Sequence, residues 1–354
     1  MCSFVHKVDY LFNRKYDLAS EILEKSILKA SSFFYMSILT FIIFAVLILG
    51  FLLTPPNNIG RGVFASSSSL NFKFVNRIPV EGTSNIQILQ PEGVATDLQG
   101  NIYVNDMEQN QIFKFSKNGS YILSWGSPGS GDGQLNHPHG SEIDRSGNVY
   151  ISDQSNTRIQ KFTDDGNFIT KWGSKGTGDG QFIHPHGIAV DSKGNVFVSD
   201  RDTARIQKFT STGTFVTKWG SEGSEDGQFI QPWDVAVDEN DLVYVPDYGN
   251  NRIQVFTGDG TFITKWGSGG NQDGQLNQPA VITFDSDGLL YVTDSGNHRI
   301  QIFDKNGNFI TKWGSKGDGK GQFLKPESID IDQFGHVYVA DTTSNNVQVF
   351  GRNN

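Results

Sequence analysis

The sequence predicts an all-β protein, a six-bladed β-propeller, preceded by one transmembrane α-helix. Three observations support the propeller: residues recur every 47 positions, each repeat contains four strand-like segments, and an isolated strand precedes the first repeat. A fixed period of about 40–50 residues is typical of propellers and solenoids. A closed ring also gives the isolated strand a partner, which a linear stack does not.

The repeat occurs six times between residues 70 and 354. The proline that marks each copy stands at Pro91, Pro138, Pro185, Pro232, Pro279 and Pro326. An Asp recurs at the same interval from Asp106 to Asp341, and a Trp from Trp125 to Trp313. In the third copy, strands are expected at 187–191, 196–200, 205–209 and 215–219. These segments are rich in β-branched and aromatic residues and are separated by Gly- and Asn-containing turns, as in four-stranded antiparallel blades.

The two ends of the repeat region predict how the ring closes. The sixth copy ends after 347–350 and lacks an outer strand, whereas Asn71–Pro79 is a strand-like segment without a blade of its own. Phe74 lies one period before Tyr121 in the outer strand of the first copy. We therefore expect the N-terminal strand to complete the last blade, which removes the exposed edges.

Residues 33–53 contain no charged side chain and are followed by Pro55 and Pro56. A helix of this length crosses a hydrocarbon core of about 30 Å. A cleaved signal peptide is the alternative, but such peptides have a shorter apolar run, of about 7–15 residues. Because most nearby Lys and Arg residues precede the span, we expect a single-pass protein of the cell membrane with a cytoplasmic N-terminus and an extracytoplasmic propeller.

The predicted organisation is a short cytoplasmic tail with an amphipathic stub (1–32), the transmembrane helix (33–53), a linker (54–69) and the propeller (70–354). The formal net charge is −9, while residues 1–65 hold six basic and four acidic residues, so the propeller is acidic. An acidic surface repels phosphate backbones, which makes nucleic acid an unlikely partner.

Four segments carry a family resemblance: NTRIQKF (156–162), ARIQKF (204–209), NRIQVF (251–256) and HRIQIF (298–303). They resemble the hallmark of NHL repeats, and the resemblance, over roughly residues 71–350, implies a six-bladed propeller. The first and last copies depart from it, with Gln111 and Asn346 in place of the Arg. NHL ubiquitin ligases also need a zinc-binding RING, which a chain whose single cysteine is Cys2 does not contain.

Residues present in nearly every copy are expected to serve the scaffold. We interpret the recurring Asp after the second strand as a turn cap, and the recurring Arg as part of an ion pair between blades. A further Asp, such as Asp97, should begin the first hairpin turn. The loops that contain Asp132, Asp179, Asp226 and Asp273 offer one carboxylate each, too few for calcium, which takes about six to eight oxygens.

The position after the marker proline varies, and it should place six side chains around one mouth of the central channel. These residues are Glu92, His139, His186, Trp233, Ala280 and Glu327. We take Glu92, His139, His186, Trp233 and Glu327 as candidate ligand-binding residues. His139, His186 and Glu92 could also hold a divalent metal such as zinc. Two inner-strand substitutions, Glu142 and Asp330 in place of alanine, add carboxylates below. The alternative is that all of these are solvated residues at a channel rim.

The pair of PHG motifs at His139 and His186 is similar to the zinc-binding motifs of peptidyl-hydroxyglycine α-amidating lyases, which share the propeller fold. That family uses three His on alternating blades, whereas this chain has two on adjacent blades, and the catalytic Tyr and Arg of the family have no evident counterpart.

Two functions follow from the sequence. The first is a non-catalytic binding module at the cell surface, recognising a protein, peptide or glycan at the channel mouth. The alternative is a metal-dependent lyase or hydrolase similar to the peptidyl-hydroxyglycine lyases or to lactonases.

Overall fold

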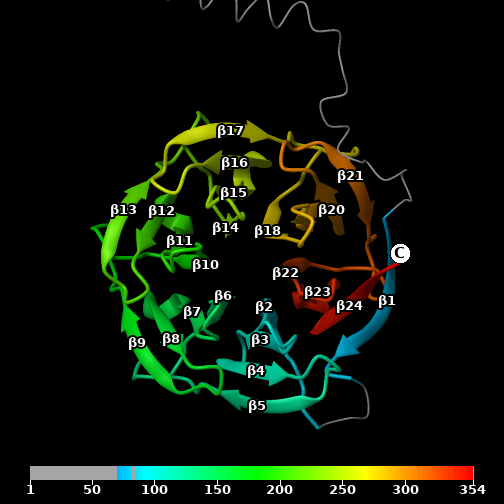
Figure 1. Cartoon of the computed structure of the whole chain (residues 1–354), viewed down its shortest axis with the longest axis horizontal. Helices are drawn as coiled ribbons and strands as arrows, with labels where there is room; N and C mark the ends of the chain where they lie inside the picture. The colour runs from blue at the N-terminus through cyan, green and yellow to red at the C-terminus, as the bar shows by residue number, and fades with distance from the viewer. Residues whose placement is uncertain (1–69, 81–84, 354) are drawn as a thin grey trace, which may run out of the picture. The chain divides into compact units, whose positions relative to one another are not determined.

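A computed structural model describes residues 70–80 and 85–353, which belong to the compact unit Ser68–Asn354. Six four-stranded antiparallel sheets surround a central axis (Figure 1), so the predicted six-bladed propeller is confirmed. The predicted tail (1–32), transmembrane helix (33–53) and linker (54–69) lie outside the described residues. Within the described ranges, no helix is long and apolar enough to cross a membrane.

The strands fall into four concentric sets. The innermost strands are β2 (Pro91–Thr96), β6 (Pro138–Ile143), β10 (Pro185–Val190), β14 (Ala236–Val237), β18 (Pro279–Phe284) and β22 (Pro326–Ile331). The second strands are β3 (Ile102–Asp106), β7 (Val149–Asp153), β11 (Val196–Asp200), β15 (Val243–Asp247), β19 (Leu290–Asp294) and β23 (His336–Asp341). The third strands are β4 (Gln111–Phe115), β8 (Arg158–Phe162), β12 (Arg205–Phe209), β16 (Arg252–Phe256), β20 (Arg299–Phe303) and β24 (Asn346–Asn353).

The outer strands are β5 (Tyr121–Trp125), β9 (Phe168–Trp172), β13 (Phe215–Trp219), β17 (Phe262–Trp266), β21 (Phe309–Trp313) and, in the last blade, β1 (Asn71–Ile78). Single 3₁₀ turns join the second and third strands of five blades: η1 (Gln154–Asn156), η2 (Arg201–Thr203), η3 (Tyr248–Asn250), η4 (Ser295–Asn297) and η5 (Thr342–Ser344).

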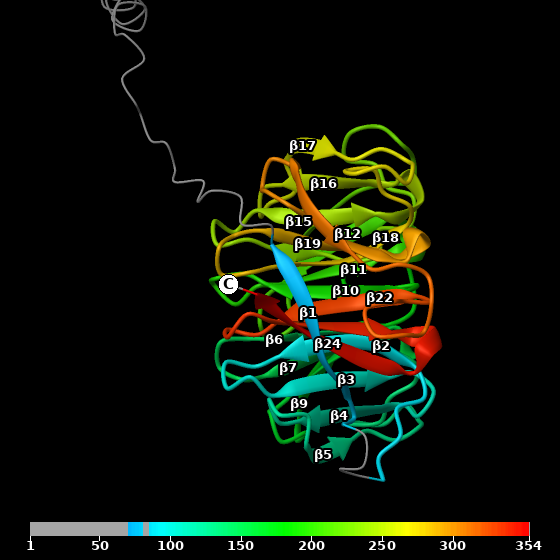
Figure 2. The ribbon, with the colours of Figure 1, turned by 90° about the vertical axis from the view of Figure 1, so that its right-hand side faces the viewer.

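The ring closes as the sequence predicts. Strand β1 pairs antiparallel with β24, and Phe74 lies opposite Phe350. This is the register that Phe168 and Phe162 adopt within the second blade. Figure 2 shows β1 beside β24, although the two strands come from opposite ends of the propeller sequence. The last blade therefore has four strands like the others, and its third strand is not left as an open edge.

Burial follows the position of each strand in the blade. The second strands of five blades are buried at every residue, because each blade is covered on both faces by its neighbours. The outer strand Phe168–Trp172 alternates instead, and Ile169 and Lys171 are exposed. Trp172 packs 5.9 Å from Phe209 of the next blade, as expected for a residue that joins neighbouring blades.

The Asp at the start of the first hairpin turn, such as Asp97, has the predicted role. Asp97 Oδ1 accepts hydrogen bonds from the backbone N–H groups of Gln99 and Asn101, at 2.9 and 2.8 Å. Such Asx turns fix a short connection between two strands.

The Asp after the second strand has the predicted role of a turn cap only in the first blade, where Asp106 Oδ1 accepts the backbone N–H of Gln109 at 3.0 Å. In the other five blades, as after Asp294, the 3₁₀ turn has no side-chain cap hydrogen bond. Asp294 instead accepts the backbone N–H of Asn277, at 2.6 Å, and thereby holds the loop that enters the blade. Our interpretation of the recurring Arg as part of an ion pair between blades is also wrong. Arg299 lies opposite Asp294 in the same sheet, and its Nε is 2.6 Å from the carboxylate.

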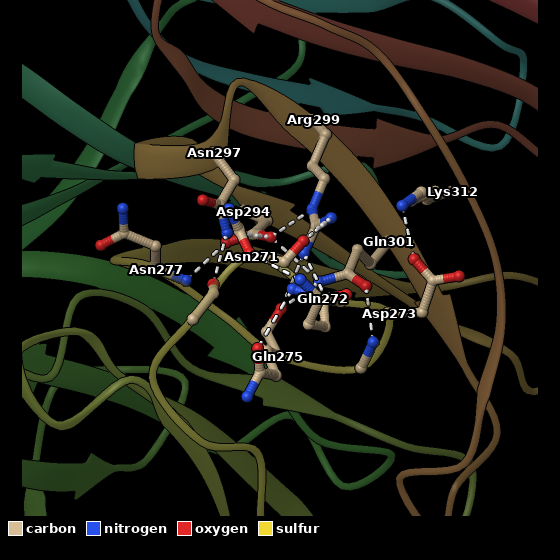
Figure 3. Close-up of polar contacts among 12 residues, drawn as sticks. Asn271, Gln272, Asp273, Gln275, Asn277, Asp294, Asn297, Arg299, Gln301 and Lys312 are labelled. Carbon is tan, nitrogen blue, oxygen red and sulfur yellow. Dashed lines mark hydrogen bonds and ion pairs between the residues drawn. The ribbon is translucent and has the colours of Figure 1, made fainter.

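The guanidinium of Arg299 also binds the same loop (Figure 3). It donates to the backbone carbonyls of Asn271, Gln272 and Gln275, each at 2.9 Å. Equivalent contacts occur at Arg158 and Arg252. The Arg is therefore a loop anchor. It is the donor to the Asn271 carbonyl, and it shares the Gln272 and Gln275 carbonyls with the Gln275 N–H and the Gln301 side chain.

Candidate functional site

In five blades the residue after the marker proline lies at the start of the innermost strand, and these strands surround the central axis (Figure 1). All six are buried: Glu92, His139, His186, Trp233, Ala280 and Glu327 are between 0 and 9% exposed. They are not the solvated rim residues of the alternative reading. In the fourth blade the regular strand begins only at Ala236, so Trp233 precedes it on a segment held by a bridge between Pro232 and Asp247.

Glu92 and His139 form an ion pair between adjacent blades. Glu92 Oε2 lies 3.3 Å from His139 Nε2, and Gln90 donates to the other carboxylate oxygen at 3.1 Å. Burial raises the pKa of Glu92, but the hydrogen bond and charge of His139 have a larger effect in the other direction. The pKa of Glu92 is therefore lowered. The carboxylate is therefore ionised at neutral pH and orients the imidazole of His139.

His186 is packed against His139, with ring centroids 3.5 Å apart, and lies 4.4 Å from the Trp233 ring. A hydrogen bond joins His186 to the backbone of Trp233. The Trp233 N–H already donates to the carbonyl of Pro246, so the group that His186 meets is the Trp233 carbonyl. Since His186 Nε2 is buried without a hydrogen-bond partner, we assign the proton of this ring to Nδ1, which faces the Trp233 backbone.

Burial, followed by the charge of His139, holds the pKa of His186 well below its usual range. The ring is therefore neutral at physiological pH. With its proton on Nδ1, His186 presents an unprotonated Nε2 lone pair that nothing in the described part of the chain occupies. It can accept a hydrogen bond or a proton from a bound molecule.

The other side of the mouth contains Glu327 and Trp233. Glu327 is fully buried, and the ammonium of Lys325 lies 2.8 Å from its Oε1. Burial raises the pKa of Glu327, although Lys325 partly offsets the shift. Trp233 is stacked on Tyr248 at 4.3 Å, and Arg201 lies over the Trp233 ring at 5.2 Å. Its indole N–H is buried without a hydrogen-bond partner.

A cavity of about 190 Å³ extends from Glu92, His139 and His186 into the channel. Its wall also contains Glu142, Asp234 and Asp330. Burial raises the pKa of Asp234 to about 7 and that of Asp330 to about 6. The pKa of Glu142 is raised well above its usual value by burial and then by the charges of Asp330 and Asp234.

The structure brings Glu92, His139 and His186 into contact in a chain from one blade to the next. However, within residues 70–80 and 85–353 no group of three or more His, Cys, Asp or Glu side chains is arranged to hold a metal ion. The zinc site predicted for these three residues gains no support from this geometry and stays a prediction.

Sequence reasoning missed several residues at the site. Asp234 occupies a position where the first three blades have Gly93, Gly140 and Gly187. A carboxylate at a glycine position of a repeat was a detectable signal. Tyr248, Arg201 and Lys325 come from connecting segments rather than from inner strands, so the repeat pattern did not associate them with the mouth.

The fold has many counterparts among solved structures. Streptogramin B lyase is 16% identical, covers 80% of this chain and 98% of its own, and has a TM-score of 0.58. A catalytically inactive His-to-Ala variant of virginiamycin B lyase from Staphylococcus aureus, solved with quinupristin, is 16% identical over 80% of this chain and 88% of its own, with a TM-score of 0.55. The gluconolactonase XC5397 from Xanthomonas campestris is 12% identical over 79% and 99%, with a TM-score of 0.57. Identities this low show the fold alone.

At the level of sequence, no curated protein matches. A model of the 6-bladed beta-propeller family matches residues 62–161 and 271–352, and a model of the NHL repeat matches 182–209 and 229–256. The first model matches the two blades at each end of the repeat region, and the second matches the third and fourth blades. The chain therefore belongs to the 6-bladed beta-propeller family and carries NHL repeats.

Proposed function

We propose that this protein is a binding module that recognises a protein, peptide or glycan ligand at the channel mouth, and that residues 33–53 anchor it in the cell membrane. The residues expected to contact the ligand are Glu92, His139, His186, Trp233 and Glu327.

The observation that supports this proposal is that polar atoms at the mouth are unsatisfied, two of them on neighbouring aromatic side chains. His186 Nε2 and Trp233 Nε1 are both buried without a hydrogen-bond partner among the described residues. Leaving such an atom unpaired costs about 1–3 kcal/mol, and a ligand with matching groups recovers that energy on binding. One atom is an acceptor and the other a donor, which suits ligands that carry hydroxyl, amide or amine groups.

The test is retention of the purified full-length chain on glycan and peptide arrays. We expect wild-type protein to bind a defined set of ligands, and His186→Ala to lose them. Ile263→Ala changes an exposed residue of an outer strand and serves as the control, because it should bind like wild type. Equal retention of all three proteins would sink the proposal.

A second candidate function is a lyase or hydrolase that acts at the same mouth. It is favoured by the contact between Glu92 and His139, which resembles the carboxylate-oriented imidazoles of acid–base catalysts. The neutral His186, with a free Nε2, is in the protonation state of a general base. Streptogramin B lyases and a gluconolactonase share the fold and provide substrates to try.

For this alternative we expect turnover of a lactone or a streptogramin B antibiotic by the wild-type protein, lost in both His139→Ala and His186→Ala. Metal analysis of the same preparations tests the predicted zinc site. Array ligands that bind without being altered, and no turnover of either substrate class, would leave the binding module as the function.

A further inference from the structure

The wall of the channel cavity is rich in carboxyl groups, and no Lys or Arg of the described chain lines it. Glu92 at the mouth, Asp234 below it and Glu142 and Asp330 further along the inner strands all belong to this wall. Burial, and then the charges of the other acids, both favour the protonated forms of Glu142 and Asp234.

The four carboxylates differ in how well the protein satisfies them. Asp330 accepts three hydrogen bonds from Thr96 and Thr283, and Asp234 accepts the backbone N–H of Ile282 at 3.1 Å. The pKa of Glu142, in contrast, is shifted only by burial and by the charges of other acids, namely Asp330, Asp234 and Asp144. Glu142 is the wall carboxylate without a compensating group.

A separate observation points to a donor as the missing group. His186 is 1% exposed, lines the same cavity, and has an Nε2 lone pair without a partner. Only an N–H or O–H group can satisfy this atom. A ligand group that both donates hydrogen bonds to His186 and neutralises the carboxylates must carry N–H bonds and a positive charge.

We infer that the part of the ligand that enters the channel is an organic cation, an ammonium or guanidinium group. This inference rests on the proposed binding function and names the chemistry that the mouth recognises. A cavity of about 190 Å³ accommodates the end of a lysine or arginine side chain, or of an amino sugar.

The arrangement suits a polyatomic cation better than a metal ion. The carboxylates are spread along the wall at successive levels of the inner strands, and they form no cluster able to hold an ion among the described residues. An ammonium or guanidinium group can reach separate acceptors through several N–H bonds in different directions.

The test is calorimetric titration of the full-length chain with Nα-acetyl-lysine amide, which carries a free ε-ammonium, and with its neutral Nε-acetylated counterpart. We expect the cationic probe to bind and the neutral probe to bind at least about tenfold more weakly, since one charge interaction in a desolvated site contributes about that much. Glu142→Gln should weaken binding of the cationic probe by a similar factor. Glu222→Gln removes the same charge from an exposed loop and should have no effect.

Binding of the cation should also release protons. The charge of the ligand favours the ionised forms of Asp234 and Asp330, which are partly protonated near pH 6.5 in the free protein. The apparent binding enthalpy at this pH should therefore depend on the ionisation enthalpy of the buffer. Asp234→Asn, checked for folding by its thermal transition, should reduce this dependence.

Equal binding of the two probes, or no binding of the cationic probe up to millimolar concentration, would overturn the inference. Binding of zinc chloride that requires His139 and His186, with no binding of the ammonium, would overturn it in favour of the metal site. In either case array ligands that depend on His186 would leave the binding function standing. Conversely, a cationic probe that binds the channel while mouth variants keep all array ligands would contradict the proposed function only.

Discussion

The loop anchors and the channel mouth are both buried and polar, yet they differ in whether their polar groups have hydrogen-bond partners. At each Arg anchor, as at Arg252, every polar group of the pair is used: the guanidinium binds Asp247 and the carbonyls of Ser224, Glu225 and Gln228. At the mouth, His186 and Trp233 keep unpaired atoms. The anchors recur as the same residue in four blades, whereas the six mouth positions hold four residue types.

This difference teaches how a repeat protein separates stability from function. A residue that every blade needs is held by the same partners in each copy. A residue such as Trp233, which the equivalent positions of the other copies lack, is not required by the blade, so its unsatisfied atom is available to a ligand. The comparison makes predictions about both regions, and the anchors should produce the largest effects on stability.

Removing one anchor should unfold the propeller more readily than any other change considered. Arg252→Ala leaves Asp247, which is fully buried, without its cation. It also removes a donor from the carbonyls of Ser224, Glu225 and Gln228, of which the last two keep one other donor each. Breaking a buried pair in this way costs about 3–5 kcal/mol. Urea unfolding of the full-length chain measures the loss.

The matched control is Lys265→Ala in the same blade. Lys265 pairs with Asp226 at 2.7 Å, but the two side chains are 41% and 57% exposed. Exposed pairs contribute about 0–1 kcal/mol. Equal losses in the two variants would show that the buried anchors do not stabilise the blades.

The hairpin glycines provide a second comparison within the scaffold. Gly213 has φ of +86°, and an added Cβ would lie 2.6 Å from the ring of Trp172. Gly147 has nearly the same φ, +82°, but an added Cβ would meet its nearest neighbour at 4.0 Å. We expect Gly147→Ala to cost about 1 kcal/mol for the left-handed backbone, and Gly213→Ala about 2–4 kcal/mol because it adds a clash.

Thermal unfolding of both variants separates the two contributions. A similar fall in Tm would mean that backbone strain accounts for the glycine at both turns. The contact between glycine and tryptophan would then have no role in joining the blades.

The channel acids should make stability depend on pH. The pKa of Asp234 rises from 3.8 to about 7 on folding, so between these values the folded state binds more protons than the unfolded state. Its contribution therefore disfavours folding increasingly as pH rises through this window, by about 2–4 kcal/mol in total. Asp234→Asn keeps an acceptor for the Ile282 N–H, and should flatten the decline of unfolding free energy between pH 4.5 and pH 8.

Asp330 contributes a decline of the same sign, which ends near pH 6 because that is its folded pKa. The unfolding free energy of Asp234→Asn should therefore still fall as pH rises, but less than that of wild type, because Asp330 and Glu142 keep raised pKa values. A decline unchanged from wild type would show that Asp234 is ionised in the folded protein.

Much of the fold could be predicted because the 47-residue period fixes it six times over. The pairing of Phe74 with Phe350 follows from the period alone, since each blade repeats the geometry of the last. The ring position of Glu92, His139 and His186 follows for the same reason. The period places residues, however, without giving the partners of their side chains.

The contacts that these side chains make are the part of the structure that could not be predicted. The loop that Arg299 binds comes from an irregular segment, so the sequence did not show that its carbonyls need donors. Tyr248 reaches the mouth from a 3₁₀ turn, and its stacking on Trp233 depends on the shortened inner strand of that blade. Where a copy departs from regular geometry, the equivalent residues of other copies are no longer a guide.

The smallest expected effect on stability comes from the indole N–H at the mouth. Trp233→Phe removes a donor that has no partner among the described residues, so the unfolding free energy should change by only about 1 kcal/mol, through lost packing. The array ligands should nevertheless bind roughly 5–30-fold more weakly, since a hydrogen bond to the ligand contributes about 1–2 kcal/mol.

Trp219→Phe is the matching change in the scaffold. The Trp219 N–H is also unpaired, but its ring packs against Phe256 of the next blade and against Gly260. We expect it to lose about 1–3 kcal/mol of stability while keeping every array ligand. The unpaired indole N–H would then bind ligand at the mouth but have no binding role in the scaffold. If Trp219→Phe weakened ligands as much as Trp233→Phe, an unpaired buried atom would not distinguish the site from the blade.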